Sequence, residues 1–251
     1  MMTSTDDGGC GGAPAASAAP DDLRIGLLKI EHNLNEGRYR PGPWERYIRE
    51  LKRSPAAARA ALCADVNRVS RKLHQRTPRK TIPVRAGVAI EIVAMALGGV
   101  LLRLSVRETS IALALAGALL WIMTFQPLVK IAAAAVLGVG YEYAYVLRGE
   151  PRFKMRFGTY VAAPRWARVA LHLFGTIGSP IGAWAAAAIV GARMPGTARV
   201  VMAVFWIVVA INALEFIAGI AGIRRIGSIR TVESSGGAAG LEIHEIRASP
   251  V

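Results

Sequence analysis

The chain has 251 residues, of which 53% are apolar, with a formal net charge of +14 and a mean hydropathy of +0.36. Only 19% of the residues are charged, which is too few for a soluble domain that also holds long uncharged apolar runs. The composition therefore excludes an ordinary soluble protein. Basic residues beside apolar runs indicate contact with anionic lipid head groups rather than nucleic acid.

The N-terminal part predicts a tail followed by a small helical module. Residues 1–20 are mostly Gly, Ala, Ser and Pro and predict a disordered tail. Residues 21–86 predict three helices, each with one apolar stripe, and a basic linker. This segment holds sixteen basic and seven acidic residues, a net charge of +9, which favours the cytoplasmic side. The three stripes can bury one another or lie on the bilayer surface, and residues 21–76 are the candidate docking site for a protein partner.

The apolar runs predict an all-α, polytopic transmembrane bundle over residues 87–223. A spanning helix needs about 20 mostly apolar residues, because the hydrocarbon core is about 30 Å thick. Glu91 lies near the start of the first run, where it can reach the head groups. Pro127 and Lys130 divide the apolar block at residues 110–146, which is too long for one span and slightly short for two. The block is therefore interpreted either as a tight hairpin or as one span followed by a re-entrant half. The five predicted spans lie near residues 87–104, 110–126, 127–147, 169–192 and 197–223.

A basic, aromatic loop at residues 147–168 decides the expected topology. It holds six basic residues and one acidic residue, and its alternating pattern predicts a short hairpin or an interfacial strand. The 21–86 and 147–168 blocks both favour the cytoplasm, which requires an even number of crossings between them. We therefore expect four full crossings and one incomplete helix in a bacterial inner membrane, with both termini inside. A simple count of five spans places the loop outside. Residues 224–251 predict a flexible tail, in which the LEIHEIR stretch is the one candidate for a short ordered segment.

Ionisable groups inside the predicted spans are candidates for function, because each costs at least about 2.5 kcal/mol within hydrocarbon. Glu142, His172 and Glu215 are the candidate catalytic residues. Lys130, Asn212 and Glu215 form the intramembrane polar set, and the structural alternative is that Glu215 pairs with a neighbour and fixes helix register. Residues expected at lipid head groups are Arg79, Lys80, Arg85, Arg152, Lys154, Arg156, Arg165 and Arg168.

The order of these features resembles the three-helix core of the site-2 protease family of intramembrane metalloproteases. The resemblance covers about residues 127–223 and depends on Tyr141-Glu142-Tyr143-Ala144-Tyr145, the basic loop and the glycine-rich start of the next span. It implies that Glu142 matches the catalytic glutamate and that Glu215 lies near the position of the acidic zinc ligand. Tyr141 and Tyr145 stand where the family has its zinc-binding histidines. The resemblance therefore implies an inactive relative.

These features predict a non-enzymatic membrane scaffold or partner-binding protein, without a metal or another cofactor. A protease-like membrane hydrolase and a small transporter or channel component are the alternatives. Expected partners are membrane lipids with anionic head groups and a protein bound through residues 21–76, while a homo-oligomer stays open.

Overall fold

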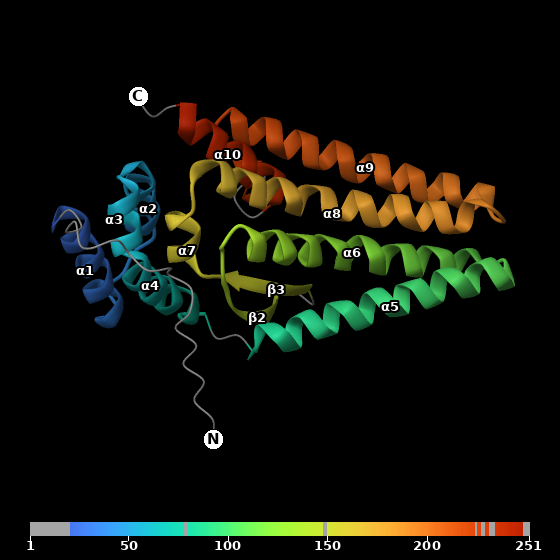
Figure 1. The fold of residues 1–251 in the computed structure, drawn as a ribbon, viewed down its shortest axis with the longest axis horizontal. Coiled ribbons are helices and arrows are strands. Elements are labelled where there is room, and N and C mark those ends of the chain that lie inside the picture. Colours follow the sequence, from blue (N-terminus) through green and yellow to red (C-terminus); the bar gives the residue numbers. More distant parts are fainter. Residues whose placement is uncertain are drawn as a thin grey trace, which may run out of the picture. The chain divides into compact units, whose positions relative to one another are not determined.

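The structure is a computed structural model that describes residues 21–77, 80–147, 150–223, 225–226, 229–230 and 234–247 (Figure 1). The predicted tail at 1–20 lies outside these residues. The described chain is all-α with a few short strands, as predicted. It divides into two compact units: unit 1 takes residues 1–81 and 137–164, and unit 2 takes residues 82–136 and 165–251.

Unit 1 joins the predicted N-terminal module to a later part of the chain. The sequence interpretation assigned the basic loop to the transmembrane bundle, whereas the structure groups residues 137–164 with the N-terminal helices. The two-residue strand β1 (Thr81–Ile82) falls at the boundary between the units. The other elements of unit 1 are α1 (Asp21–Asn35), α2 (Pro43–Arg53), α3 (Ala56–Ala61), α4 (Cys63–Gln75), β2 (Tyr141–Leu147), β3 (Glu150–Met155) and α7 (Phe157–Ala162).

The predicted apolar stripes of the N-terminal helices form the core of unit 1. Leu23, Leu27 and Ile30 of α1 are buried, as are Val66 and Val69 of α4. Residues three or four apart share one helix face, so each helix buries one stripe against its neighbours and leaves its polar side in solvent.

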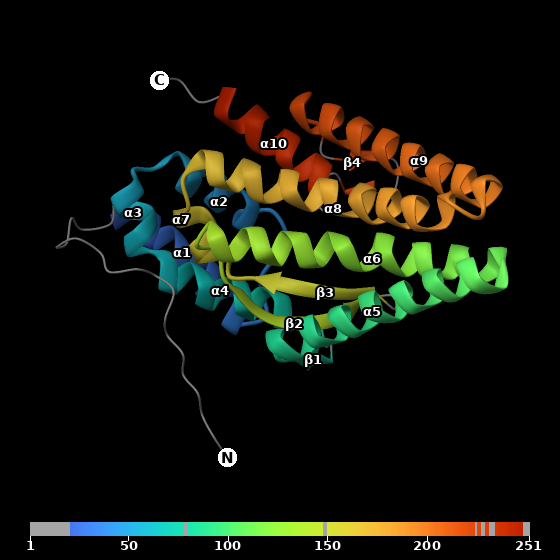
Figure 2. The same cartoon turned by 45° about the vertical axis from the view of Figure 1, so that its right-hand side comes forward.

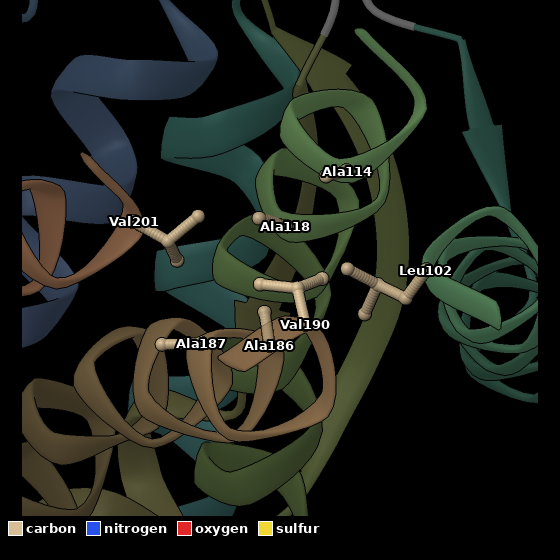
Figure 3. Packing of buried hydrophobic residues seen from close by; sticks show 7 residues of the cluster. All are labelled: Leu102, Ala114, Ala118, Ala186, Ala187, Val190 and Val201. Atoms are coloured by element: carbon tan, nitrogen blue, oxygen red, sulfur yellow. The ribbon is translucent and has the colours of Figure 1, made fainter. Parts of the chain in front are cut away.

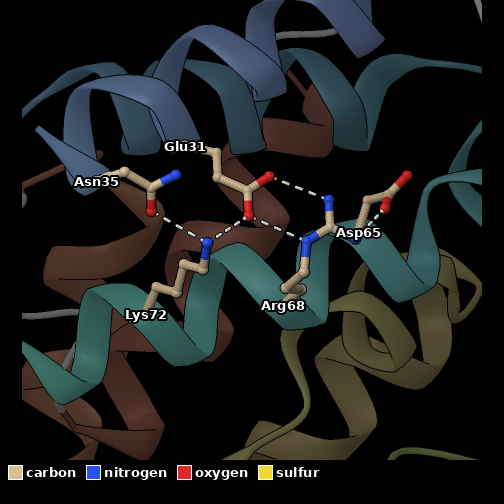
Figure 4. A network of polar contacts seen from close by, with 5 residues as sticks. All are labelled: Glu31, Asn35, Asp65, Arg68 and Lys72. Atoms are coloured by element: carbon tan, nitrogen blue, oxygen red, sulfur yellow. Dashed lines mark hydrogen bonds and ion pairs between the residues drawn. The ribbon is translucent and has the colours of Figure 1, made fainter.

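A polar network ties α1 to α4 at the edge of this core (Figure 4). Arg68 Nε and Nη2 donate to the two carboxylate oxygens of Glu31, both at 3.0 Å. Lys72 Nζ donates to Glu31 Oε1 at 2.8 Å and to Asn35 Oδ1 at 3.1 Å. The hydrogen bonds from Arg68 and then from Lys72 lower the pKa of Glu31 to about 2.

The division of this block into spans at 110–126 and 127–147 is wrong, whereas the expectation of four full crossings agrees with the four helices, among the described residues, that are long and apolar enough to span a membrane. One helix, α6 (Ile111–Val136), continues through Pro127, and the strand β2 follows it. A membrane helix accommodates a proline when its surroundings satisfy the freed carbonyl, so Pro127 does not divide the block. Gly138, with φ of +70°, follows the end of α6, and the aromatic and β-branched residues after it favour a strand.

Unit 2 contains four helices that are long and apolar enough to cross a membrane: α5 (Val84–Glu108), α6, α8 (Arg165–Gly191) and α9 (Pro195–Ile220). The protein is therefore a membrane protein. The spans predicted near 87–104, 169–192 and 197–223 correspond to α5, α8 and α9. Exposed Trp184, Trp206 and Ile207 are typical of side chains that face lipid.

The helices of unit 2 meet through small residues. A buried cluster joins α5, α6, α8 and α9 (Figure 3). A side chain at Gly178 would lie 2.5 Å from Cα of Gln126, and one at Gly182 would lie 2.6 Å from the carbonyl oxygen of Trp121. The two helices approach closely at these glycines, because α8 there touches the backbone of α6. The clustered residues are Leu102, Ala114, Ala118, Ala186, Ala187, Val190 and Val201.

The predicted flexible tail contains an ordered helix, α10 (Ser235–Arg247), which lies beside α8 and α9 (Figures 1 and 2). It follows the short strands β4 (Arg225–Ile226) and β5 (Ile229–Arg230), which pair with each other. The prediction of a flexible tail was wrong for the SGGAAG stretch, which looks like a linker, whereas the candidate LEIHEIR segment does lie in α10. In the structure these small residues let α10 approach the α9 backbone closely: a side chain at Gly240 would overlap the carbonyl oxygen of Phe216.

Candidate functional site

The structure divides the predicted polar residues between the two units. Glu142 lies on β2 in unit 1. Lys130, His172 and Glu215 lie on α6, α8 and α9 in unit 2. The candidate catalytic set therefore comes from two separate units, and each unit has its own polar cluster.

In unit 1, Glu142 contacts α4. Arg71 Nε donates to Glu142 Oε1 at 2.6 Å, and the glutamate side chain is only 6% exposed. Arg71 itself is more than half exposed. The prediction that Glu142 lies within a spanning helix is wrong. In the structure it is a strand residue whose charge is neutralised by an arginine at the edge of the unit.

The second contact between the hairpin and α4 is made by Lys154. Its Nζ donates to Ser70 Oγ at 2.7 Å and to the carbonyl oxygen of Met155 at 3.0 Å. Burial lowers the pKa of Lys154 to about 8, opposed by the charge of Glu142. The expectation that Lys154 contacts lipid head groups is wrong, since its ammonium group is used inside the unit.

His74 completes this surface between α4 and the hairpin. Its Nδ1 lies 2.8 Å from Tyr143 Oη, and its ring meets the ring of Tyr145 edge-on at 4.7 Å. Asn67, one turn before Ser70 and Arg71, accepts the backbone N–H of Gly158 at 2.6 Å. One face of α4 therefore binds the second segment of unit 1 through successive polar contacts. We call this set the α4–hairpin cluster: Asn67, Ser70, Arg71, His74, Glu142, Tyr143, Tyr145 and Lys154.

The α4–hairpin cluster contains a serine and a lysine in contact, as some catalytic sites do, but both side chains have internal partners. A serine hydroxyl 2.7 Å from a lysine with a lowered pKa is the pairing that a serine–lysine hydrolase uses. However, Ser70 is buried, and Lys154 also donates to a backbone carbonyl. The polar groups thus satisfy one another, and the arrangement holds the hairpin on α4.

The polar cluster of unit 2 surrounds α10. Arg168 Nε of α8 donates to Glu242 Oε2 of α10 at 3.0 Å, and both side chains are almost fully buried, at 2% and 3% exposure. The expectation that Arg168 contacts lipid head groups is therefore wrong. His172, one turn further along α8, is also buried. Sequence reasoning missed Glu242 because it lies in the part of the chain interpreted as a tail; the LEIHEIR stretch around it was the available signal.

Lys130 also reaches α10. Its Nζ lies 3.3 Å from Ser235 Oγ, and a side chain at Gly175 would lie 3.0 Å from Lys130 Cδ and 2.6 Å from Ser235 Oγ. On α9, Asn212 Nδ2 donates to the carbonyl oxygen of Val208 at 3.0 Å. Glu215 is half-buried. Lys130 and Asn212 therefore both lie at the start of α10, because a side chain at Gly236 would lie 2.7 Å from the carbonyl oxygen of Asn212.

The remaining predicted lipid contacts differ in exposure. Lys80, Arg85 and Arg165 are exposed, as that role requires, whereas Arg152 and Arg156 are half-buried. Arg79 lies outside the described residues. Lys80, Arg85 and Arg165 flank the starts of α5 and α8, where basic side chains meet head groups most readily.

Among the described residues, no group of three or more His, Cys, Asp or Glu side chains could hold a metal ion. The segment that resembles the site-2 protease motif is a strand here, so Tyr141, Glu142 and Tyr145 do not share a helix face. No protein-family model, no curated protein and no solved structure matches this chain.

Proposed function

We propose that this protein is a non-enzymatic, multi-pass scaffold of a bacterial inner membrane. In this proposal four helices cross the membrane, and unit 1 lies on the cytoplasmic side. There it carries the docking site for a protein partner, while Lys80, Arg85 and Arg165, beside the starts of α5 and α8, contact anionic head groups. Its polar clusters hold the fold together and do not act on a substrate.

The observation that carries the topology is that unit 1 is built from two separate segments of the chain. Its two chain segments bind each other through Arg71 and Glu142 and through Asn67 and Gly158. Two segments of one folded unit lie on the same side of a membrane. Between them the chain contains α5 and α6, and two crossings return it to the side on which it began.

The charge distribution supports a cytoplasmic unit 1. The blocks 21–86 and 147–168 carry net charges of +9 and +5. The opposite ends of the four helices, residues 103–110 and 191–199, hold four basic residues and one acidic residue, a net charge of +3. Because basic loops stay in the cytoplasm, this asymmetry favours unit 1 inside.

The proposed absence of catalysis is supported by the internal partners of Glu142, one of the three candidate catalytic residues, and of the polar residues Lys154 and Arg168. Glu142 is paired with Arg71, and Lys154 donates to Ser70 and a carbonyl. Arg168 is paired with Glu242. A general base must reach a substrate proton, and side chains committed to internal partners have lost that freedom.

Reporter insertions into the whole chain test the topology. Alkaline phosphatase inserted after Thr109 or after Arg193 is expected to be active, because those connections then lie outside. A fluorescent protein fused after Val251 is expected to fluoresce, as it does only when folded in the cytoplasm. Active phosphatase fused after Val251 would contradict the proposal.

A second experiment tests the lipid contact. The protein is reconstituted in nanodiscs with and without phosphatidylglycerol, and its thermal unfolding is followed. Anionic lipid is expected to raise the midpoint for the natural chain and to raise it less for Arg85→Gln with Arg165→Gln. Arg24→Gln, an exposed arginine of α1, is the matched control and should keep the full lipid effect. An equal lipid effect in all three proteins would remove the proposed contact.

A further inference from the structure

Glu91 is a buried acidic residue in the first long helix of unit 2. Its exposure is 2%, although the sequence placed it where it could reach the head groups. It shares one face of α5 with buried Gly87, Gly98 and Leu102. Gly98 contacts Trp121, and Leu102 contacts Gly117, so this face packs against α6. The Glu91 side chain is therefore directed into the protein and away from the lipid.

The carboxyl group of Glu91 differs from the other buried carboxyl groups described. Glu142 meets Arg71 at 2.6 Å, and Glu242 meets Arg168 at 3.0 Å. Glu91 Oε1 is buried and has no hydrogen-bond partner among the residues that the structure describes. The chain from Ala86 to Leu102 holds no other ionisable side chain, so α5 supplies no counter-charge nearby. On α6, against which this face packs, the one ionisable side chain is Lys130, and its ammonium group is directed to Ser235 of α10.

A lone buried carboxylate is very unfavourable. The ionised form loses its hydration and gains no cation in return, whereas the neutral acid loses far less on burial. Arginine neutralises the other two carboxyl groups, and a bound proton is the smallest group that can neutralise the third.

We propose that Glu91 is a proton-binding site inside unit 2, where its carboxyl group is held as the neutral acid. This site does not depend on the scaffold role. Carboxyl groups that hold a proton inside a membrane bundle are the elements from which proton pathways are built. The site therefore gives the bundle one functional group that a purely structural role would not require.

Infrared spectroscopy of the full-length protein in lipid tests this proposal directly. A protonated carboxyl group gives a carbonyl stretching band separate from those of carboxylates and amides. The band is expected in the natural protein and should be lost in Glu91→Gln. The matched control is Glu108→Gln, which changes an exposed glutamate at the end of α5 and should keep the band.

Two results would overturn the proposal: no such band in the natural protein, or a band that Glu91→Gln retains. Glutamine has nearly the shape of the neutral acid, so Glu91→Gln should fold. If it does not, Glu91→Asp replaces it, because an aspartic acid at this position must shift the band. An unshifted band in that variant also overturns the assignment.

Discussion

Arg168 Nε lies 3.0 Å from Glu242 Oε2, and this ion pair joins α8 to α10 with both side chains buried. A buried ion pair is costly to form, but it is much more costly to break by removing one partner, because a lone charge is left behind. The pair therefore makes the position of α10 specific: a shift of this helix would leave two buried charges apart.

We expect Glu242→Gln to destabilise the protein by about 3–5 kcal/mol, since Arg168 would keep its charge without its carboxylate. Unfolding in detergent, followed by circular dichroism, measures this. The double variant Arg168→Met with Glu242→Met should be less destabilised than Glu242→Gln, because it leaves no lone charge. Equal stability of Glu242→Gln and the natural protein would show that the pair does not hold α10.

Gly240→Ala should release α10 from α9. The added methyl group would overlap the carbonyl oxygen of Phe216, which belongs to the α9 backbone and cannot rotate away. We expect faster amide hydrogen exchange throughout α10, measured by mass spectrometry. Gly196→Ala is the control, because a side chain there meets nothing within 4 Å, and its exchange should match that of the natural protein.

Lys154 predicts a pH dependence of unit 1. Its pKa falls from 10.5 to about 8 on folding, so between these values the unfolded chain binds more protons than the folded one. Stability should therefore rise as pH increases from about 8 to 10.5. Unfolding by urea at several pH values measures this rise, and Lys154→Met should remove it. If both proteins show the same slope, Lys154 is not buried as the structure places it.

Glu31 predicts a loss of stability at low pH, whereas Lys154 predicts a gain in stability at high pH. Its pKa falls from 4.5 to about 2, so its contribution is present above pH 4.5 and is lost as the pH falls toward 2. Glu31→Gln should lose the part of the acid sensitivity that comes from this group, measured as the unfolding midpoint between pH 5 and 2. The gain is modest, because Arg68 is about half exposed and solvent screens the pair.

Much of this architecture is predictable from local sequence. The stripe of Leu23, Leu27 and Ile30 predicts α1, and the long apolar runs predict α5, α8 and α9, because helix period and length are properties of short windows. The alternation of Phe153 and Met155 with Lys154 correctly predicts an extended segment. These features need no knowledge of distant parts of the chain.

The errors occur where distant segments decide the structure. The segment around Glu142 looks like the end of a membrane span when only its own sequence is considered. It forms strand β2 because it pairs with β3 and because Glu142 accepts a hydrogen bond from Arg71. The SGGAAG sequence looks like a linker until α9 is placed against it. Neither the partner of Glu242 nor the lack of a partner at Glu91 Oε1 can be found by local periodicity.

Unit 1 is assembled from segments that the ribosome makes at different times. Gly158 and its partner Asn67 are separated by 91 residues of chain, and α5 and α6 are synthesised between them. The polar face of α4 therefore stays without its partner segment until α5 and α6 have been synthesised and residues 137–164 follow. Completion of unit 1 is thereby coupled to the synthesis of α5 and α6, and a chain arrested at α6 would display an incomplete unit 1 to quality-control proteases.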